Sequence, residues 1–174
     1  FRKKEECVTQ VACLWELCRR RQIRNSPTFL LFIDFKKAYD SVPHEALFRK
    51  LYNYGVRGRT LRFIETLYRS STLRVRTGTG ASAILSDMVD LLRGVRQGWP
   101  FSPVLFNIFI NDIFDGVDEL GISVEYGSGT APKTLAARIC GLLFADDCVG
   151  ITEDRDNMEL MCAHFSQWAQ RNEL

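Results

Sequence analysis

The sequence has no apolar run long enough to cross a membrane, and it has few of the residues that build zinc sites. A transmembrane helix needs about 18 or more consecutive apolar residues, and no such run occurs in the 174 residues. The six cysteines include no C-x-x-C pair, and the histidines, His44 and His164, stand apart from them. We therefore expect a soluble intracellular protein without a membrane span or a zinc site.

The chain ends also lack the features of a complete protein. There is no initiator methionine, Phe1 leads directly into charged residues, and Leu174 closes a helical pattern. We expect a fragment of something longer. Its composition, 46% hydrophobic and 25% charged, is typical of one globular domain.

Basic residues are concentrated in two stretches. Residues 47–76 carry eight Lys or Arg against the single acid Glu65, and residues 1–24 carry seven against three acids. Such segregation is typical of a protein that grips a phosphate backbone beside an acidic, cation-binding centre. A solvated helix face is the other interpretation, and charge alone leaves both open.

Apolar spacing predicts a mixture of helices and strands. Residues 4–21 form a helix with Val8, Val11, Trp15 and Cys18 on its apolar side, and residues 28–34 form a buried strand that ends at Asp34. Helices follow at 44–54 and 59–70, with Leu47, Leu51, Tyr54, Leu61, Ile64 and Leu67 facing inward. Strands at 72–77 and 83–91 flank a Gly-rich turn.

The second half contains a glycine and proline punctuated loop at 94–103, which leads into a helix with Ser102 as its cap and Pro103 as its first residue. Strands at 137–144 and 148–152 are joined through Asp146 and Asp147. A last helix runs from about 155 and carries Met158, Met161, Cys162, Phe165 and Trp168. Trp15 and Trp168 are expected in the core, and Cys140, Cys148 and Cys162 are expected to behave as small hydrophobic residues.

The adjacent pair Asp146 and Asp147 lies between two apolar stretches. Burying a carboxylate costs free energy unless a cation or hydrogen bonds compensate for it. In a tight hairpin both side chains can approach one metal site. The same pair is also typical of a surface β-turn, so both interpretations stay open.

Asp34 ends an apolar strand that we expect beside this hairpin in one sheet. Two strands would then present carboxylates to a shared cleft. Nucleotidyl transfer uses such an arrangement, with two Mg²⁺ ions about 3.5–4 Å apart and oxygen ligands. Residues 35–38 offer backbone N–H groups for phosphates. Tyr39 is either a core aromatic or a residue that fills the space a ribose 2′-hydroxyl would need.

Three motifs together resemble the palm of a reverse transcriptase of the non-LTR (LINE-like) retrotransposon type. Residues 32–42 (FIDFKKAYDSV) resemble its first catalytic motif, including the aromatic steric gate. Residues 94–103 (GVRQGWPFSP), followed by LFN at 105–107, resemble its template and nucleotide-positioning motif. Residues 144–147 (FADD) are similar to its aspartate-pair box. Phe1, Arg2, Lys3 and Cys7 resemble the segment before the first motif, so the match spans nearly the whole chain.

The resemblance implies an α+β fold, a polymerase palm with a ferredoxin-like antiparallel sheet backed by helices, plus part of the fingers. Residues 1–174 would form one partial reverse transcriptase domain, without the thumb and the N-terminal finger strands. The implied activity is RNA-directed DNA synthesis, in which dNTPs extend a DNA primer on an RNA template. LINE-like elements imply action in the nucleus. Oligomeric state and the RNA that is copied are not readable from the sequence.

The resemblance also implies roles for individual residues. Two Mg²⁺ ions, with Mn²⁺ as a substitute, would be held by the catalytic residues Asp34, Asp146 and Asp147. The nucleotide would contact Phe35, Lys36, Ala38, Tyr39, Gln97 and Gly98. Template and primer would contact Arg96, Pro100, Ser102, Phe144 and Ala145.

Several positions depart from the family pattern. Trp99 stands where a small or acidic residue is usual, and its indole could narrow the template path. Asp87 and Asp90 lie where a more basic or neutral strand is expected. One alternative is therefore a catalytically inactive retroelement-derived remnant that still binds nucleic acid. Another is a different palm-type metalloenzyme, a nucleotide cyclase or an RNA-templated RNA polymerase, against which the 94–103 motif and Tyr39 argue.

Overall fold

The computed structural model describes residues 7–80, 83–96, 98–126 and 135–174. The chain divides into two compact units. The first, called the sheet unit, comprises the chain up to Ala38 together with Ile110–Asn172. The second, called the helical unit, comprises Tyr39–Phe109 and Glu173–Leu174. Each unit is described by itself.

The sheet unit is built on a three-stranded antiparallel sheet with strand order β1-β9-β8. Its strands are β1 (Phe29–Ile33), β8 (Gly141–Phe144) and β9 (Asp147–Thr152). The strands are short apolar runs. The predicted burial of the strand at 28–34 was wrong, because β1 is an edge strand and its five residues are exposed or only partly buried. In the register, Leu31 lies opposite Gly150 and Leu142 lies opposite Val149. This antiparallel sheet with helices confirms the expected α+β class.

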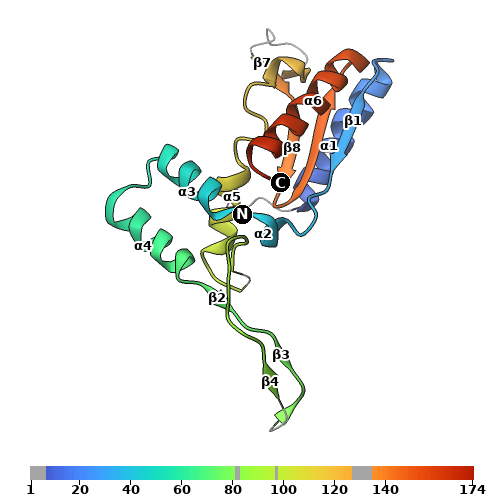
Figure 1. The fold of residues 1–174 in the computed structure, drawn as a ribbon. Helices are drawn as coiled ribbons and strands as arrows, with labels where there is room; N and C mark the ends of the chain where they lie inside the picture. The colour runs from blue at the N-terminus through green and yellow to red at the C-terminus, as the bar shows by residue number, and fades with distance from the viewer. Residues whose placement is uncertain (1–6, 81–82, 97, 127–134) are drawn as a thin grey trace. The chain divides into compact units, whose positions relative to one another are not determined.

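Helices cover both faces of this sheet (Figure 1). The helix α1 (Cys7–Ile23) packs Leu17 into a buried cluster with Val149 and Ile151. On the other face lies α6 (Arg155–Arg171), whose Met161 is so close to Gly150 that an added Cβ would lie 2.4 Å from its sulfur. Alternate residues of a strand point to opposite faces, which explains how β9 serves both helices.

The terminal helix agrees well with its sequence pattern. It begins at Arg155, after the N-cap Asp154, whose side chain accepts a hydrogen bond of 2.7 Å from the Asn157 amide. Trp168 is buried, as predicted, and its Nε1 donates to Asp112 at 2.8 Å. Cys162, predicted to behave as a small hydrophobic residue, is exposed.

The packing face of α1 differs from the prediction. Val8, Val11 and Trp15 are 74%, 60% and 61% exposed, whereas Leu17 is buried. The expected apolar stripe, and the core position of Trp15, were therefore wrong. Both sides of the helix carry apolar residues, and the sheet selects the side that includes Leu14 and Leu17. Spacing alone cannot decide between two such sides.

The strand predicted at 137–144 is in fact two strands in different sheets. Residues Leu135–Ile139 form β7, which pairs with β6 (Ile122–Tyr126) after the short 3-10 helix η2 (Asp118–Leu120). The break falls at Cys140, whose carbonyl accepts a hydrogen bond of 2.8 Å from the Ile151 amide. The chain thereby passes from the small sheet into β8 without a loop.

The helical unit contains the helix pair α3 (His44–Asn53) and α4 (Gly58–Arg69) (Figure 1). Leu47 and Leu51 are fully buried as predicted, but Tyr54 is 48% exposed because it follows the last helical residue. His44 begins α3 as expected, and its Nε2 lies 2.9 Å from the Gly94 carbonyl oxygen. Burial lowers the His44 pKa, which keeps the ring neutral for this contact.

Two short helices and a narrow ribbon accompany this pair. The helices are α2 (Ala38–Ser41) and α5 (Ser102–Ile110). The strands expected at 72–77 and 83–91 exist only as two-residue pieces: β2 (Thr72–Leu73) pairs with β5 (Val89–Asp90), and β3 (Arg76–Thr77) pairs with β4 (Ile84–Leu85). All eight residues of these pairs are exposed. None of the helices in the described ranges combines the length and the apolar character that crossing a membrane requires.

Candidate active site

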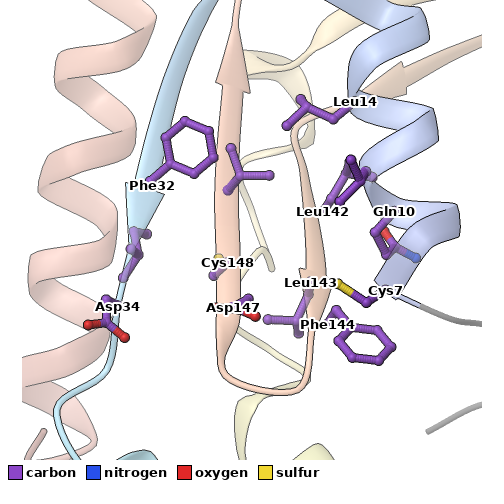
Figure 2. Close-up of a pocket in the computed structure, with 13 residues that line it drawn as sticks. Cys7, Gln10, Leu14, Phe32, Asp34, Leu142, Leu143, Phe144, Asp147 and Cys148 are labelled. Atoms are coloured by element: carbon purple, nitrogen blue, oxygen red, sulfur yellow. The ribbon is translucent and has the colours of Figure 1, made fainter.

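Two of the three predicted carboxylates line one cavity in the sheet unit. Asp34 follows the last residue of β1, and Asp147 is the first residue of β9. Because Ile33 lies opposite Cys148 in the antiparallel pair, the end of β1 lies beside the start of β9. Both aspartates belong to the lining of a cavity of about 340 Å³ (Figure 2).

The register explains why these two side chains share a cavity. Phe144 pairs with Asp147, and Leu142 pairs with Val149, and paired residues point to the same face of a sheet. This is the face that α1 covers through Leu17 and Val149. Phe32, opposite Val149, belongs to it as well. The carboxylates thus lie near strand ends, beside apolar cavity walls.

Asp146 lies in the tight turn between β8 and β9. Since Phe144 pairs with Asp147, the turn consists of Ala145 and Asp146 alone. Ala145 has φ +54°, a conformation that two-residue hairpins usually assign to glycine. Among the described residues, Asp146 does not line the cavity of Asp34 and Asp147. It is partly buried at the tip of the hairpin.

The sequence interpretation missed several cavity residues. Cys7 and Gln10 on α1, and Phe32 on β1, line the same cavity as the carboxylates. Figure 2 shows Cys7 and Gln10 approaching from α1. Phe32 and Asp34 are two residues apart on one strand, so their side chains point to the same face. This spacing could have predicted that Phe32 lines the cavity beside Asp34. Nothing in the sequence alone indicated that the start of α1 would lie there.

The structure gives the three aspartate side chains no bonded partner among the residues that it describes. In the ranges that the structure describes, no side chain forms an ion pair or a hydrogen bond with the carboxylates of Asp34, Asp146 or Asp147. Asp34 and Asp147 are exposed. Adjacent negative charges without a compensating base favour an external cation.

The carboxylate oxygens of Asp34 and Asp147 are the type of ligand that a hard divalent cation prefers. Among the described residues there is no group of three His, Cys, Asp or Glu side chains placed to hold a metal. Mg²⁺, however, is usually held by one or two carboxylates and completes its octahedron with water and substrate phosphates. Two carboxylates at one cavity therefore suit Mg²⁺ or Mn²⁺, and they do not suit a closed protein-only site.

Cys148 borders the carboxylates and lines the same cavity. Burial, and then the neighbouring Cys140, raise the pKa of the Cys148 thiol to about 12. Burial also raises the pKa of Cys140. Both thiols therefore stay protonated near neutral pH and cannot act as thiolate nucleophiles. Their burial confirms that they behave as small hydrophobic residues.

A second cavity, of about 450 Å³, lies in the helical unit. It is lined by Tyr39, Gly98, Trp99, Pro100, Ser102 and Pro103. The Tyr39 ring stacks on Phe106 with 4.6 Å between centroids and an angle of 14°. The structure therefore brings together the predicted steric-gate tyrosine and part of the 94–103 motif, with the unusual Trp99 among them.

Gly94 fixes the start of the loop that carries this motif. Gly94 has φ +94°, and a Cβ at this position would lie 3.1 Å from the Asp40 carbonyl oxygen, so the close approach requires glycine. The Gly94 and Val95 amides donate to the carbonyls of Val42 and Tyr39 at 2.8 and 2.7 Å. Gln97, predicted to contact the nucleotide, lies outside the described residues.

Arg96 and Ser102 hold the fold of this loop. Arg96 Nη2 donates to Ser71 Oγ at 2.5 Å and to the Leu67 carbonyl at 3.3 Å, and its guanidinium lies 4.8 Å from the Trp99 ring centroid. Ser102 begins α5, but its hydroxyl donates to the Arg96 carbonyl instead of capping the helix through its oxygen. The predicted side-chain cap was therefore wrong, because Ser102 is buried against this loop.

The four residues after Asp34, at 35–38, differ in burial and in the contacts they make. Phe35 contacts Trp168 edge-on at 6.1 Å, Lys36 is exposed, and Ala38 is 6% exposed at the start of α2. Lys37 has φ +53°, a left-handed conformation that no feature of the sequence predicts. The predicted roles of these residues in phosphate binding stay predictions.

Comparison with known proteins gives a reverse transcriptase family model and retrotransposon polyproteins. The family model for "Reverse transcriptase (RNA-dependent DNA polymerase)" matches residues 1–174. The Pol polyprotein of the type-1 retrotransposable element R2 of Popillia japonica is 28% identical over 163 residues, 91% of this chain and 25% of that protein. The R2DM polyprotein of Drosophila melanogaster is 29% identical over 134 residues, 76% of this chain and 11% of that protein.

The fold has a solved counterpart. The structure of apo telomerase from Candida tropicalis, truncated from its C-terminal domain, covers 93% of this chain with a TM-score of 0.58 at 15% identity, and this chain covers 32% of it. That likeness concerns the fold alone. The chain spans a quarter or less of the R2 relatives named above. By the family model and these relatives, the chain belongs to the reverse transcriptase family, with the non-LTR retrotransposon members as its relatives.

Proposed function

We propose that this chain forms the core of an RNA-directed DNA polymerase that adds dNTPs to a DNA primer 3′-hydroxyl on an RNA template. The observation that carries the proposal is the shared cavity of Asp34 and Asp147 at the ends of two paired strands. The family match over residues 1–174 supports the reaction class. Action in the nucleus is proposed from the retrotransposon relatives alone.

In this proposal Asp34, Asp147 and the adjacent Asp146 hold two divalent metal ions. When bound, these ions activate the primer hydroxyl and stabilise charge on the triphosphate. The protein's own contribution is orientation. The carboxylates, which form no ion pair within the described residues, would bind and position the cations, and the two-residue turn would set the angle between Asp146 and Asp147.

Tyr39 and Gly98 would receive the nucleotide, together with Gln97, Phe35, Lys36 and Ala38. The stacked, partly buried ring of Tyr39 offers a wall against a ribose 2′-hydroxyl, and this would favour dNTPs. Pro100, Ser102, Phe144 and Ala145 would lie along template and primer. Arg96 would act through the loop that it holds, since its guanidinium already donates to Ser71 and Leu67.

A second candidate function is nucleic-acid binding without catalysis. It is favoured by Trp99 in the Tyr39 cavity and by the lack of a three-ligand metal group among the described residues. Against it stand the three intact aspartates. A measurement of DNA polymerase activity distinguishes the polymerase function from nucleic-acid binding without catalysis.

Primer extension on an RNA template with Mg²⁺ or Mn²⁺ tests the proposal. We expect dNTP incorporation that falls about a hundredfold or more in Asp146→Asn, since a metal carboxylate is lost. The exposed Asp156 on α6 is the matched control, and Asp156→Asn should be unaffected. Tyr39→Ala should raise rNTP incorporation relative to dNTP by about tenfold or more.

Absence of incorporation, in a folded chain that still retains a primer–template hybrid in a gel-shift assay, would favour the binding function. A preference of the unmodified chain for rNTPs would contradict the role given to Tyr39.

A further inference from the structure

Within the helical unit, the segment that carries Tyr39 is bonded to the start of the 94–103 loop. The Val95 amide donates to the Tyr39 carbonyl at 2.7 Å, and an isolated antiparallel bridge continues the pairing. We call this contact between residues 39–44 and 92–95 the gate junction. A shift of either segment would move the backbone of Tyr39, the residue to which we assign the discrimination against a ribose 2′-hydroxyl.

Gly94 lies in the gate junction and is bonded through both of its backbone groups. Its amide donates to the Val42 carbonyl at 2.8 Å, and its carbonyl oxygen lies 2.9 Å from Nε2 of His44. Gly94 is buried, and a Cβ here would lie 3.1 Å from the Asp40 carbonyl oxygen. Because a carbonyl only accepts hydrogen bonds, Nε2 carries the proton and donates it. The His44 side chain is therefore a hydrogen-bond donor of the gate junction.

Aromatic packing fixes the direction of the His44 ring. The ring is 5% exposed, and its centroid lies 4.9 Å from that of Tyr68, edge-on at 69°, and 6.2 Å from that of Phe48. Both aromatic neighbours are buried. Burial also lowers the pKa of His44, which favours the neutral ring. A packed ring of this kind keeps its N–H directed at the Gly94 carbonyl.

One peptide group links the His44 donor to Tyr39. The carbonyl of Gly94 and the amide of Val95 belong to the same peptide bond, which is planar and rigid. His44 bonds one side of this plane, and the Tyr39 carbonyl bonds the other. Without the His44 bond the plane can rotate, because the glycine before it has wide backbone freedom. Rotation would weaken the bond between Val95 and Tyr39.

We propose that His44 is a positioning residue for the choice between dNTPs and rNTPs. It acts through the Gly94–Val95 peptide on Tyr39, whose ring stacks on Phe106 and lines the cavity of about 450 Å³. His44 is buried and is not among the described residues that line this cavity, so it acts without touching the nucleotide. The inference rests on the proposed polymerase function and on the gate role of Tyr39.

Two substitutions separate the hydrogen bond from the packing. In His44→Phe the ring still packs against Tyr68 and Phe48, but it donates no hydrogen bond. In His44→Gln the side-chain amide can donate to the Gly94 carbonyl in place of Nε2. The measurement is kcat/KM for dNTPs and for rNTPs in primer extension by the whole chain. The dNTP-to-rNTP ratio should fall about tenfold in His44→Phe and stay close to the unmodified value in His44→Gln.

This ratio does not depend on how much of the protein is folded, because both substrates are measured on one preparation. The matched control is His164→Phe, which removes a similar contact of 2.8 Å between Nε2 and the Ile113 carbonyl in the sheet unit. It should leave the ratio unchanged. In a Tyr39→Ala background, His44→Phe should lower the ratio no further, because the residue through which His44 acts is gone.

Amide hydrogen exchange, followed by nuclear magnetic resonance without substrates, tests the positioning independently of activity. The Val95 amide should exchange about tenfold faster in His44→Phe than in the unmodified chain, since its bond to Tyr39 is weakened. In His44→Gln and in His164→Phe its exchange should be unchanged. If the chain extends no primer at all, the proposed function fails, whereas this comparison still tests the role of His44.

Three results would overturn the inference. The first is an unchanged dNTP-to-rNTP ratio, or unchanged Val95 exchange, in His44→Phe. The second is a His44→Gln variant that behaves like His44→Phe, which would assign the effect to ring packing. The third is a lower ratio in Tyr39→Ala/His44→Phe than in Tyr39→Ala alone, which would show that His44 acts by a route that bypasses Tyr39.

Discussion

Ala145 shows how a single residue carries conformational strain in the aspartate turn. Its φ of +54° is left-handed, a region that costs a non-glycine residue about 1–2 kcal/mol. Two-residue hairpins normally place glycine or asparagine there. Strain of this kind is found at functional sites, where the surrounding structure imposes it. Here the paired strands β8 and β9 impose it on the residue before Asp146.

Ala145→Gly should therefore stabilise the chain. Relief of the left-handed strain outweighs the extra freedom that glycine gives the unfolded chain, and the net gain should be about 0.5–1 kcal/mol. Urea unfolding measures it. The control is Ala163→Gly on the exposed side of α6, which should cost about 1 kcal/mol. A loss of stability in Ala145→Gly would show that the turn is not strained.

The sequence correctly predicted where Asp34 and Asp147 lie relative to the strands, and it predicted packing less well. Asp34 and Asp147 could be placed at strand ends because apolar runs bound them. Trp15 could not be placed, since its exposure depends on which side of α1 the sheet covers. Lys37 and Ala145 adopt left-handed backbone without being glycine, so no sequence rule identified them.

At the scale of elements, a pair of glycines leaves room for side chains that pack on the sheet, Met161 of α6 at Gly150 and Phe114 at Gly141. Gly141 lies opposite Gly150 in adjacent strands. An added Cβ would lie 2.2 Å from the Phe114 ring at Gly141, and 2.4 Å from the Met161 sulfur at Gly150. Met161 is fully buried, and the Phe114 and Phe165 ring centroids lie 5.5 Å apart, so a methyl group at either glycine would displace a packed side chain.

Gly150→Ala should consequently lower the free energy of unfolding by about 1–3 kcal/mol, the usual cost of overpacking. Met161→Ala should cost about 2–5 kcal/mol through the cavity it leaves. In the double variant the new methyl group enters that cavity, so its cost should be less than the sum of the two. Additive costs, measured by urea unfolding, would mean that Gly150 and Met161 do not pack together.

Elements with a clear period and a clear end were predictable. The terminal helix has both, with Asp154 as its cap and Trp168 on its buried side. The strand expected at 137–144 was not, because both its halves are apolar and the switch between sheets at Cys140 is a tertiary event. The antiparallel ribbon between residues 72 and 90 is limited to two separate two-residue pairs, β2 with β5 and β3 with β4.

At the scale of the whole molecule, the order of three motifs predicted the family, and the match over residues 1–174 confirmed it. No single motif was sufficient. The fold class followed from the same order. What the sequence could not provide was the surroundings of the carboxylates: the wall formed by α1, and the absence of a third metal-binding group among the described residues.

The central claim is that Asp34, Asp146 and Asp147 hold the two divalent cations of the proposed reaction, and that Asp34 and Asp147 share one of them. Mn²⁺ titration of the whole chain, followed by the electron paramagnetic resonance signal of the free ion, tests it most directly. Asp34→Asn and Asp147→Asn should each weaken binding by about tenfold or more, and the double variant should be little weaker than either, because both carboxylates serve the same ion. Asp156→Asn should leave binding unchanged. Unaltered Mn²⁺ binding in Asp34→Asn, or fully additive losses in the double variant, would contradict a shared site.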